Sequence, residues 1–158
     1  MEVSELGNVF ALIGAALAVS LPAIGSAIGT GWVQQSVAGI ISEQPNKFGR
    51  TLILQLVPSS NALYGLIVGF LILNNAVLAG GDGYTAVEGL AILAICIPIA
   101  LVGLVACLMQ AKVCVAGVRM VGKRMELSGR ALTMAVFIEL FALFALIISV
   151  LGVLNIGT

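Results

Sequence analysis

The stretch ALTMAVFIELFALFALIISVLGVLNIGT, residues 131–158, contains a single charged side chain, Glu139, and decides the fold class. It is longer than the roughly 20 apolar residues that an α-helix needs to cross the hydrocarbon core of a bilayer. Three more runs without Asp, Glu, Lys or Arg, each also longer than this minimum, lie between Glu5 and Glu43, between Arg50 and Asp82, and between Glu88 and Lys112. The sequence therefore predicts an all-α membrane protein with four transmembrane helices.

The composition supports this prediction. Of the 158 residues, 61% are hydrophobic and only 9% are charged, whereas a soluble domain has about 25% charged residues. So few charges cannot cover the surface of a soluble fold of this size, so we expect the lipid bilayer to cover much of it. The formal net charge is zero, which gives no indication of nucleic acid or another strongly charged partner.

Turn-forming residues divide the chain into helices expected at about 7–41, 47–78, 86–122 and 127–155. The connections are short, so sequential helices should be antiparallel neighbours in a single membrane domain, residues 1–158. A shift of 78 residues lays VAGI at 37–40 over VAGV at 115–118, and Asn61 over Glu139. We interpret this as two fused hairpins, residues 7–79 and 85–156, in which one copy has a carboxylate and the other an amide.

The basic residues predict the orientation of these helices. All seven lie at or near the connections at 42–50 and 119–130: Lys47, Arg50, Lys112, Arg119, Lys123, Arg124 and Arg130. The positive-inside rule then makes both connections cytoplasmic and both termini non-cytoplasmic.

Small residues distinguish the first and third helices from the others. In the first helix they include Gly25 and Gly29, four residues apart. Small residues allow close helix–helix packing in lipid. The second and fourth helices are richer in Leu, Ile and Phe, so we expect them to face lipid. The three cysteines all fall in the third helix and are interpreted as packing residues, because the chain has no His and no CxxC motif.

Glu139 is the main candidate for chemistry. It lies roughly 18 Å along the fourth helix from the basic connection, given a rise of 1.5 Å per residue. A charge at this depth costs about 2.5–3.5 kcal/mol on insertion scales, and such residues usually mark ion pathways. We expect its carboxyl group either to be protonated or to bind a cation. The alternative is a structural carboxyl group that forms hydrogen bonds between helices.

Polar groups on other helices reach a similar depth. Asn61 and Gln110 lie at comparable distances from the basic connections, and Ser60 and Tyr64 surround Asn61 on the second helix. Pro58 should loosen the backbone around Val57 and free a carbonyl group. Carboxylate, amide, hydroxyl and carbonyl oxygens suit a hard cation such as Na⁺. The alternative for Asn61 and Gln110 is interhelical hydrogen bonding.

The sequence contains no P-loop, GxGxxG, GxSxG or paired zinc spacing. We therefore expect no enzymatic activity in this chain and no nucleotide site, and ion movement through Glu139 would need another component to drive it. Two other classes stay open from the residues alone: a small secondary transporter or antiporter that uses one membrane Glu, and a structural or pore-forming four-helix protein.

Several motifs resemble one family. QPNKFG at 44–49, LILQLVP at 52–58, LYG at 63–65, QAKV at 110–113, VAG at 115–117 and FIE at 137–139 are similar to the proteolipid (K or c) subunit of bacterial V-type, or V/A-type, rotary ATPases. The resemblance covers nearly the whole chain. It implies a homo-oligomeric ring in the bacterial plasma membrane that turns against a stator membrane subunit. Central-stalk subunits would link the ring to a soluble head that hydrolyses or makes ATP.

The resemblance also implies roles for individual residues. Glu139 would carry the ion, with Val57 (backbone carbonyl), Ser60, Asn61 and Gln110 as further ligands and Tyr64 hydrogen-bonded to the carboxylate. Sodium-carrying members have Thr-Gln where this chain has Ser60-Asn61, so the amide of Asn61 is shorter by one methylene. Because polar groups gather at one membrane level, we expect Na⁺ to be carried, with H⁺ as the alternative.

Overall fold

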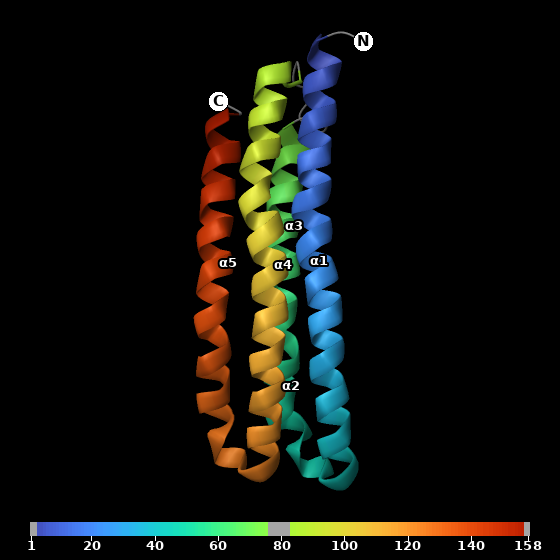
Figure 1. Ribbon diagram of the computed structural model, residues 1–158, viewed down its shortest axis with the longest axis vertical. Coiled ribbons are helices and arrows are strands. Elements are labelled where there is room, and N and C mark those ends of the chain that lie inside the picture. Colours follow the sequence, from blue (N-terminus) through green and yellow to red (C-terminus); the bar gives the residue numbers. More distant parts are fainter. Residues whose placement is uncertain (1–2, 76–82, 157–158) are drawn as a thin grey trace.

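The computed structural model describes residues 3–75 and 83–156, and in these ranges all regular structure is helical (Figure 1). Four stretches in them are long and apolar enough to cross a membrane, which confirms the predicted fold class. The first and third are single helices, α1 (Val3–Glu43) and α4 (Ala86–Lys123). The fourth is a short 3-10 helix, η4 (Met125–Leu127), followed by α5 (Ser128–Ile156). The expected second-helix end at Leu78 and the turn at 80–82 lie outside the described residues.

The second stretch is not one continuous α-helix. It consists of η1 (Pro45–Lys47), α2 (Phe48–Leu56), η2 (Val57–Ser59) and α3 (Ser60–Leu73). Pro58 has no N–H group, so it cannot donate the α-helical hydrogen bond to the carbonyl of Leu54. The chain tightens into the 3-10 turn η2 at this point and then resumes as α3. The expectation of a single helix over residues 47–78 is corrected in this respect: at Pro58, where a loosened helix was expected, the chain changes its helical type.

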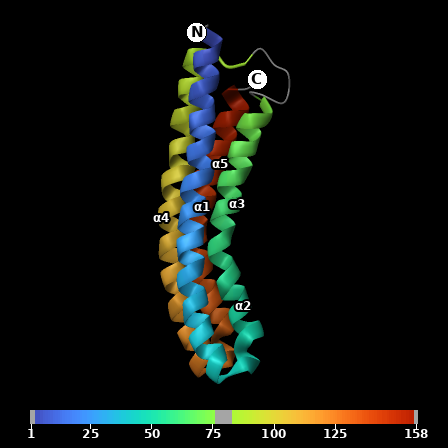
Figure 2. The same cartoon turned by 90° about the vertical axis from the view of Figure 1, so that its right-hand side faces the viewer.

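The helices form an elongated bundle (Figure 1). The start of α1 and the end of α5 lie at one end of it, and the 3-10 turns η1 and η4 lie at the other end. Helix α4 lies between α1 and α5 (Figure 1), and α3 packs against α1 and α5 (Figure 2). The basic connections are therefore at the same end of the bundle. The antiparallel order of neighbours agrees with the prediction from the short connections.

Small residues bring α1 and α4 into close contact along their length, as predicted. A Cβ atom added at Gly25 would lie 2.9 Å from the carbonyl oxygen of Leu104, and one added at Gly29 would lie 2.8 Å from the Cβ of Ala111. Such separations are shorter than carbon–oxygen and carbon–carbon van der Waals contacts. Only glycine permits this helix separation at the two positions, and dispersion contacts between the backbones then hold the pair together.

A proline inside α1 determines how closely α3 approaches. Pro22 cannot donate a hydrogen bond to the carbonyl of Ala18. This carbonyl faces Gly65 of α3, where an added Cβ would overlap with it. The absence of a side chain at Gly65 therefore lets α3 lie against α1, and this contact fixes the position of the adjacent Tyr64.

Polar contacts stabilise both ends of the bundle. Helix α4 begins with a capping box, in which the hydroxyl of Thr85 accepts from the N–H of Glu88 and the Glu88 carboxylate accepts from the N–H of Thr85 at 2.8 Å. At the other end, the buried ammonium group of Lys47 donates to the carbonyl of Gly122 near the C-terminus of α4. A cation is favourable at this end of a helix, so Lys47 ties the first hairpin to the second.

Candidate functional site

The predicted site residues come from three of the membrane-spanning stretches. Glu139 belongs to α5 and Gln110 to α4, while Asn61 and Tyr64 belong to α3, in the two turns that follow the break at η2. The hydrogen bonds made by these four residues and by Val57 and Ser60 fall into three groups.

The first group joins α3 to α5. The hydroxyl of Tyr64 donates to Oε1 of Glu139 at 2.6 Å, and both side chains are half-buried. A short hydrogen bond to a carboxyl oxygen at this depth is strong because the surrounding dielectric is low. It directs the carboxyl group of Glu139 toward α3 and leaves Oε2 as a further acceptor.

The second group joins α3 to α4 and then to α5. The amide nitrogen of Asn61 donates to Oε1 of Gln110 at 3.0 Å, and the amide nitrogen of Gln110 donates to the backbone carbonyl of Ala135 at 3.3 Å. Both amide side chains are 0% exposed. The side-chain oxygen of Asn61, Oδ1, is buried and has no hydrogen-bond partner within the described part of the chain. Burying a polar oxygen without a hydrogen-bond partner or a bound ligand costs free energy in a low-dielectric interior.

The third group lies where η2 meets α3, between Val57 of η2 and Ser60, the first residue of α3. The hydroxyl of Ser60 donates to the carbonyl of Val57 at 2.8 Å, and the N–H of Ser60 donates to the same oxygen. A carbonyl oxygen has two lone pairs, so both acceptor positions of Val57 are occupied in this conformation. Rotation of the Ser60 hydroxyl would free one of these positions for another donor or ligand.

Two donors at η2 were not predicted from the sequence. Ser26 of α1 donates to the carbonyl of Pro58 at 2.9 Å, and Cys107 of α4 donates to the same carbonyl at 2.9 Å. The hydroxyls of Thr30 and Ser59 lie 3.3 Å apart beside this pair. The cysteines are free and buried, as expected for packing residues, but Cys107 also makes a polar contact. The available signal was the pair of hydroxyls at 26 and 30, one helical turn apart in an otherwise apolar segment.

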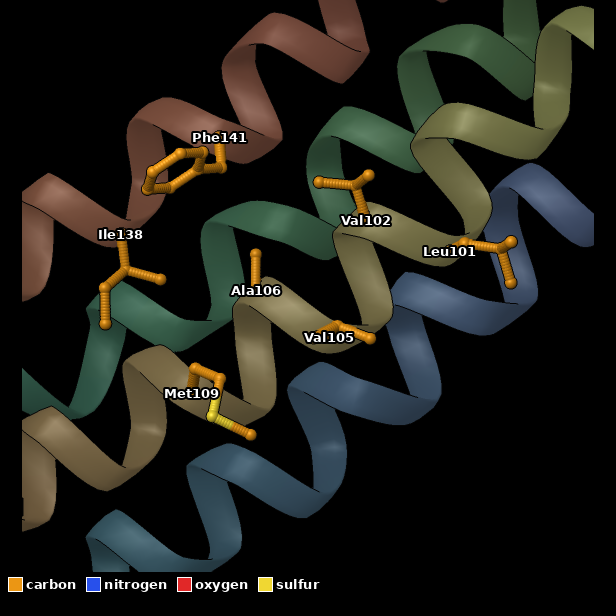
Figure 3. A pocket seen from close by; sticks show the side chains of 7 residues that line it. All are labelled: Leu101, Val102, Val105, Ala106, Met109, Ile138 and Phe141. Atoms are coloured by element: carbon orange, nitrogen blue, oxygen red, sulfur yellow. The ribbon is translucent and has the colours of Figure 1, made fainter.

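An apolar groove of about 510 Å³ lies between α4 and α5 (Figure 3). It is lined by Leu101, Val102, Val105, Ala106, Met109, Ile138 and Phe141. None of these side chains offers an oxygen or nitrogen ligand, so the groove suits hydrocarbon and not an ion. The polar groups lie where α3 faces α4 and α5.

These groups define a class of protein. One carboxyl group bonded to a hydroxyl, a pair of buried amides, and a serine hydroxyl bonded to a backbone carbonyl all occur inside membrane-spanning segments. An all-oxygen set with one negative charge fits a small hard monovalent cation, and a carboxyl group with a hydroxyl donor also fits a proton. The fold and the site are those of a membrane proteolipid with a carboxyl group in the middle of the bilayer.

Comparison with known proteins gives the family. The model of the family described as the C subunit of ATP synthase matches residues 13–72 and 93–151. The chain belongs to this family, as the resemblance of its motifs implied.

Curated relatives agree with the assignment. The chain is 38% identical to the V-type sodium ATPase subunit K of Enterococcus hirae over 149 residues, which are 94% of this chain and 93% of that protein. It is 34% identical to the A-type ATP synthase subunit K of Methanocaldococcus jannaschii over 139 residues, covering 88% of this chain and 59% of the archaeal protein. The 16 kDa proteolipid of the V-type proton ATPase of Ovis aries is 27% identical over 147 residues, 93% of this chain and 92% of the sheep protein.

The relatives narrow the choice that the residues alone left open. They are named as subunits of V-type ATPases and of an A-type ATP synthase, which supports a rotor-ring subunit over an antiporter or a structural four-helix protein. Their names include both a sodium and a proton ATPase, so the family itself is compatible with either ion.

Proposed function

We propose that this chain carries Na⁺ across the membrane as the rotor-ring subunit of a V-type ATPase, with Glu139 as the charged ligand. Asn61, Gln110, Ser60 and the carbonyl of Val57 complete the coordination, and Tyr64 orients the carboxylate. Hydrolysis or synthesis of ATP takes place in other subunits. The proposal includes a homo-oligomeric ring, a stator membrane subunit that the ring passes, and central-stalk subunits at the end of the bundle that holds η1 and η4.

The observation that carries the choice of Na⁺ is the unpartnered oxygen of Asn61. A proton carrier needs only the carboxyl group and a hydrogen-bond partner, and Tyr64 already supplies one. Two fully buried amides would then be a cost without a benefit. They are explained if Asn61 Oδ1 and Gln110 Oε1 replace water molecules of a hydrated cation. The sodium ATPase among the relatives supports the same ion.

The proposal is tested by labelling Glu139 with a carbodiimide, which reacts with the protonated acid. Bound Na⁺ keeps the carboxylate ionised, so sodium at millimolar concentration should slow labelling at fixed pH, and more strongly as the pH rises. Potassium at equal ionic strength is the control. Equal labelling rates in sodium and potassium would contradict the choice of ion and leave a proton as the cargo.

The proton is the second candidate, and one observation favours it. Both lone pairs of the Val57 carbonyl are occupied, so this proposed Na⁺ ligand is available only after Ser60 rotates. A protonated Glu139 needs no such rearrangement, because Tyr64 already provides a hydrogen-bond donor and Oε2 provides a site for the proton.

We also propose that the end of the bundle with η1 and η4 is cytoplasmic. The basic residues gather at this end, and loops rich in Lys and Arg stay in the cytoplasm. Single cysteines at Asn46 and at Thr85, in a chain freed of Cys96, Cys107 and Cys114, test the orientation with a membrane-impermeant maleimide on intact cells. Labelling at position 85 and protection at position 46 are expected, and the reverse pattern would contradict the orientation.

We further propose that the two hairpins, residues 7–79 and 85–156, are copies of one ancestral hairpin. The family model matches one part of each hairpin, which is what a duplication would produce.

A further inference from the structure

Two side chains and one backbone carbonyl in the bundle core make a polar contact that the proposed ion site does not use. The carbonyl oxygen of Pro58 accepts from the hydroxyl of Ser26 and from the thiol of Cys107, each at 2.9 Å. The two donors come from different helices, α1 and α4, and lie 3.4 Å from each other. Ser26 is 6% exposed, Cys107 is 0% exposed and Pro58 is buried. Water therefore does not replace either donor.

The position of this contact matters because of what lies around it in η2. Val57 precedes Pro58 directly, Ser60 follows two residues later, and Asn61 follows three residues later. The Pro58 carbonyl is bonded to α1 and α4, and the side chain of Asn61 is 0% exposed and bonded to α4, so both face the bundle core. Pro58 also interrupts the α-helical hydrogen bonding of this stretch, so the turn needs other contacts to fix its direction.

We propose that Ser26 and Cys107 are positioning residues that hold the peptide group after Pro58 against α1 and α4. Through it they fix the Val57 carbonyl, the Ser60 hydroxyl and the Asn61 amide at the distances that the cation needs. Neither residue touches the ion. The inference rests on the proposed function, because it deepens the account of the same site.

The expected consequence is specific. Without one donor, the buried carbonyl of Pro58 keeps only the other donor, and η2 gains freedom to turn because one of its two ties to the neighbouring helices is lost. The ligands after Pro58 then spend less time in the binding geometry, so sodium affinity falls while the carboxyl group of Glu139 stays in place. Tyr64 is held separately, by the contact of Gly65 with α1.

The test measures the sodium concentration that half-protects Glu139 from carbodiimide labelling at fixed pH, in purified assembled protein. Ser26→Ala should raise this concentration about 3- to 10-fold, the effect of one hydrogen bond. Cys107→Ala should raise it about 2- to 5-fold, since a thiol is a weaker donor. Cys107→Ser keeps a donor at the position and should restore a value near that of the unmodified chain.

Ser149→Ala is the matched control. Ser149 of α5 is 0% exposed, and its hydroxyl donates to the backbone carbonyl of Ile95 at 2.8 Å. The substitution therefore removes the same kind of interhelical hydrogen bond at a place away from η2. We expect assembly to be retained and the half-protecting concentration to stay unchanged.

The outcomes separate two kinds of failure. If sodium protects the unmodified chain but Ser26→Ala and Cys107→Ala behave like Ser149→Ala, the positioning role is wrong and the proposed function stands. A half-protecting concentration for Cys107→Ser as high as that of Cys107→Ala would also overturn the role, because it would show that side-chain packing and not the donor matters. If sodium does not protect the unmodified chain, the proposed ion is wrong and the inference falls with it.

Discussion

The second membrane-spanning stretch, Pro45–Leu73, and the fourth, Met125–Ile156, begin alike and differ in the middle. Each starts with a 3-10 turn and continues as an α-helix. The second is interrupted at η2, where hydroxyl, amide and carbonyl groups gather, whereas α5 runs without interruption past Glu139. Under the proposed function the two stretches have divided roles, in which the interrupted helix would supply neutral ligands and the continuous helix the charge.

The contacts of the two stretches agree with such a division. At the interruption, the carbonyl of Val57 and the hydroxyl of Ser60 lie at hydrogen-bond distance from each other. Uninterrupted α5 holds the carboxyl group of Glu139, where the hydroxyl of Tyr64 from α3 reaches it.

The largest effect on ion transport is expected when the charge on the continuous helix α5 is removed. Glu139→Gln keeps the shape of the side chain and removes its charge, so ion transport by the reconstituted ATPase should fall at least about 100-fold while assembly survives. Glu126→Gln in η4 is the control for the same substitution outside the site, and its transport should be unchanged. Normal transport by Glu139→Gln would refute the central assignment.

A swap of the two residues tests whether the helices are interchangeable. The double variant Asn61→Glu, Glu139→Asn keeps one carboxyl and one amide group at the site. We expect it to stay inactive, because the side chain at 61 is fully buried and bonded to Gln110, whereas the Tyr64 hydroxyl is bonded to the side chain at 139. Transport comparable to that of the unmodified chain would show that the two stretches have equivalent roles.

A smaller effect is expected for the hydrogen bond between the two stretches. Tyr64→Phe removes the donor to Glu139 and keeps the ring, so the sodium concentration for half-protection from carbodiimide should rise about 10-fold. Tyr84→Phe serves as the control, because Tyr84 lies outside the membrane-spanning segments and does not contact Glu139. An unchanged value for Tyr64→Phe would mean that the carboxylate is oriented by other groups.

The smallest effect on sodium affinity is expected when the amide side chain at position 61 is lengthened. Asn61→Gln keeps the amide and adds one methylene, so sodium affinity should change by less than about 5-fold. Asn61→Leu, which removes the amide oxygen at similar volume, should weaken sodium binding much more, by about 10-fold or more. If the two variants bound sodium equally well, the oxygen of Asn61 would not be a ligand.

Much of the fold was predictable from the sequence because the bilayer imposes simple length and polarity rules. Charge-free runs indicated the four spans, and the small residues at 25 and 29 indicated the close α1–α4 contact that the structure has. The interruption at η2 was only partly predictable. Pro58 indicated a loosened helix, but Pro22 occurs inside a helix that continues, so a proline alone does not decide whether the chain changes its helical type.

The candidate site was predictable as a set of residues at one depth but not as a set of contacts. Counting along helices placed Asn61, Gln110 and Glu139 at a common level, and the resemblance implied the hydrogen bond between Tyr64 and Glu139 that the structure has. Counting does not give the rotation of each helix about its axis. For this reason the amide pair, the double occupancy of the Val57 carbonyl and the contacts of Ser26 and Cys107 emerged only from the structure.

The most direct test of the divided roles is the number of sodium ions bound per chain. Purified assembled protein is equilibrated with ²²Na⁺ at saturating concentration, and bound ion and chain are both quantified. One ion per chain is predicted, with none in Glu139→Gln, because the interrupted helix of the first hairpin supplies ligands without a charge of its own. Two ions per chain, or one that persists in Glu139→Gln, would contradict the account, as would the absence of sodium binding in the unmodified chain.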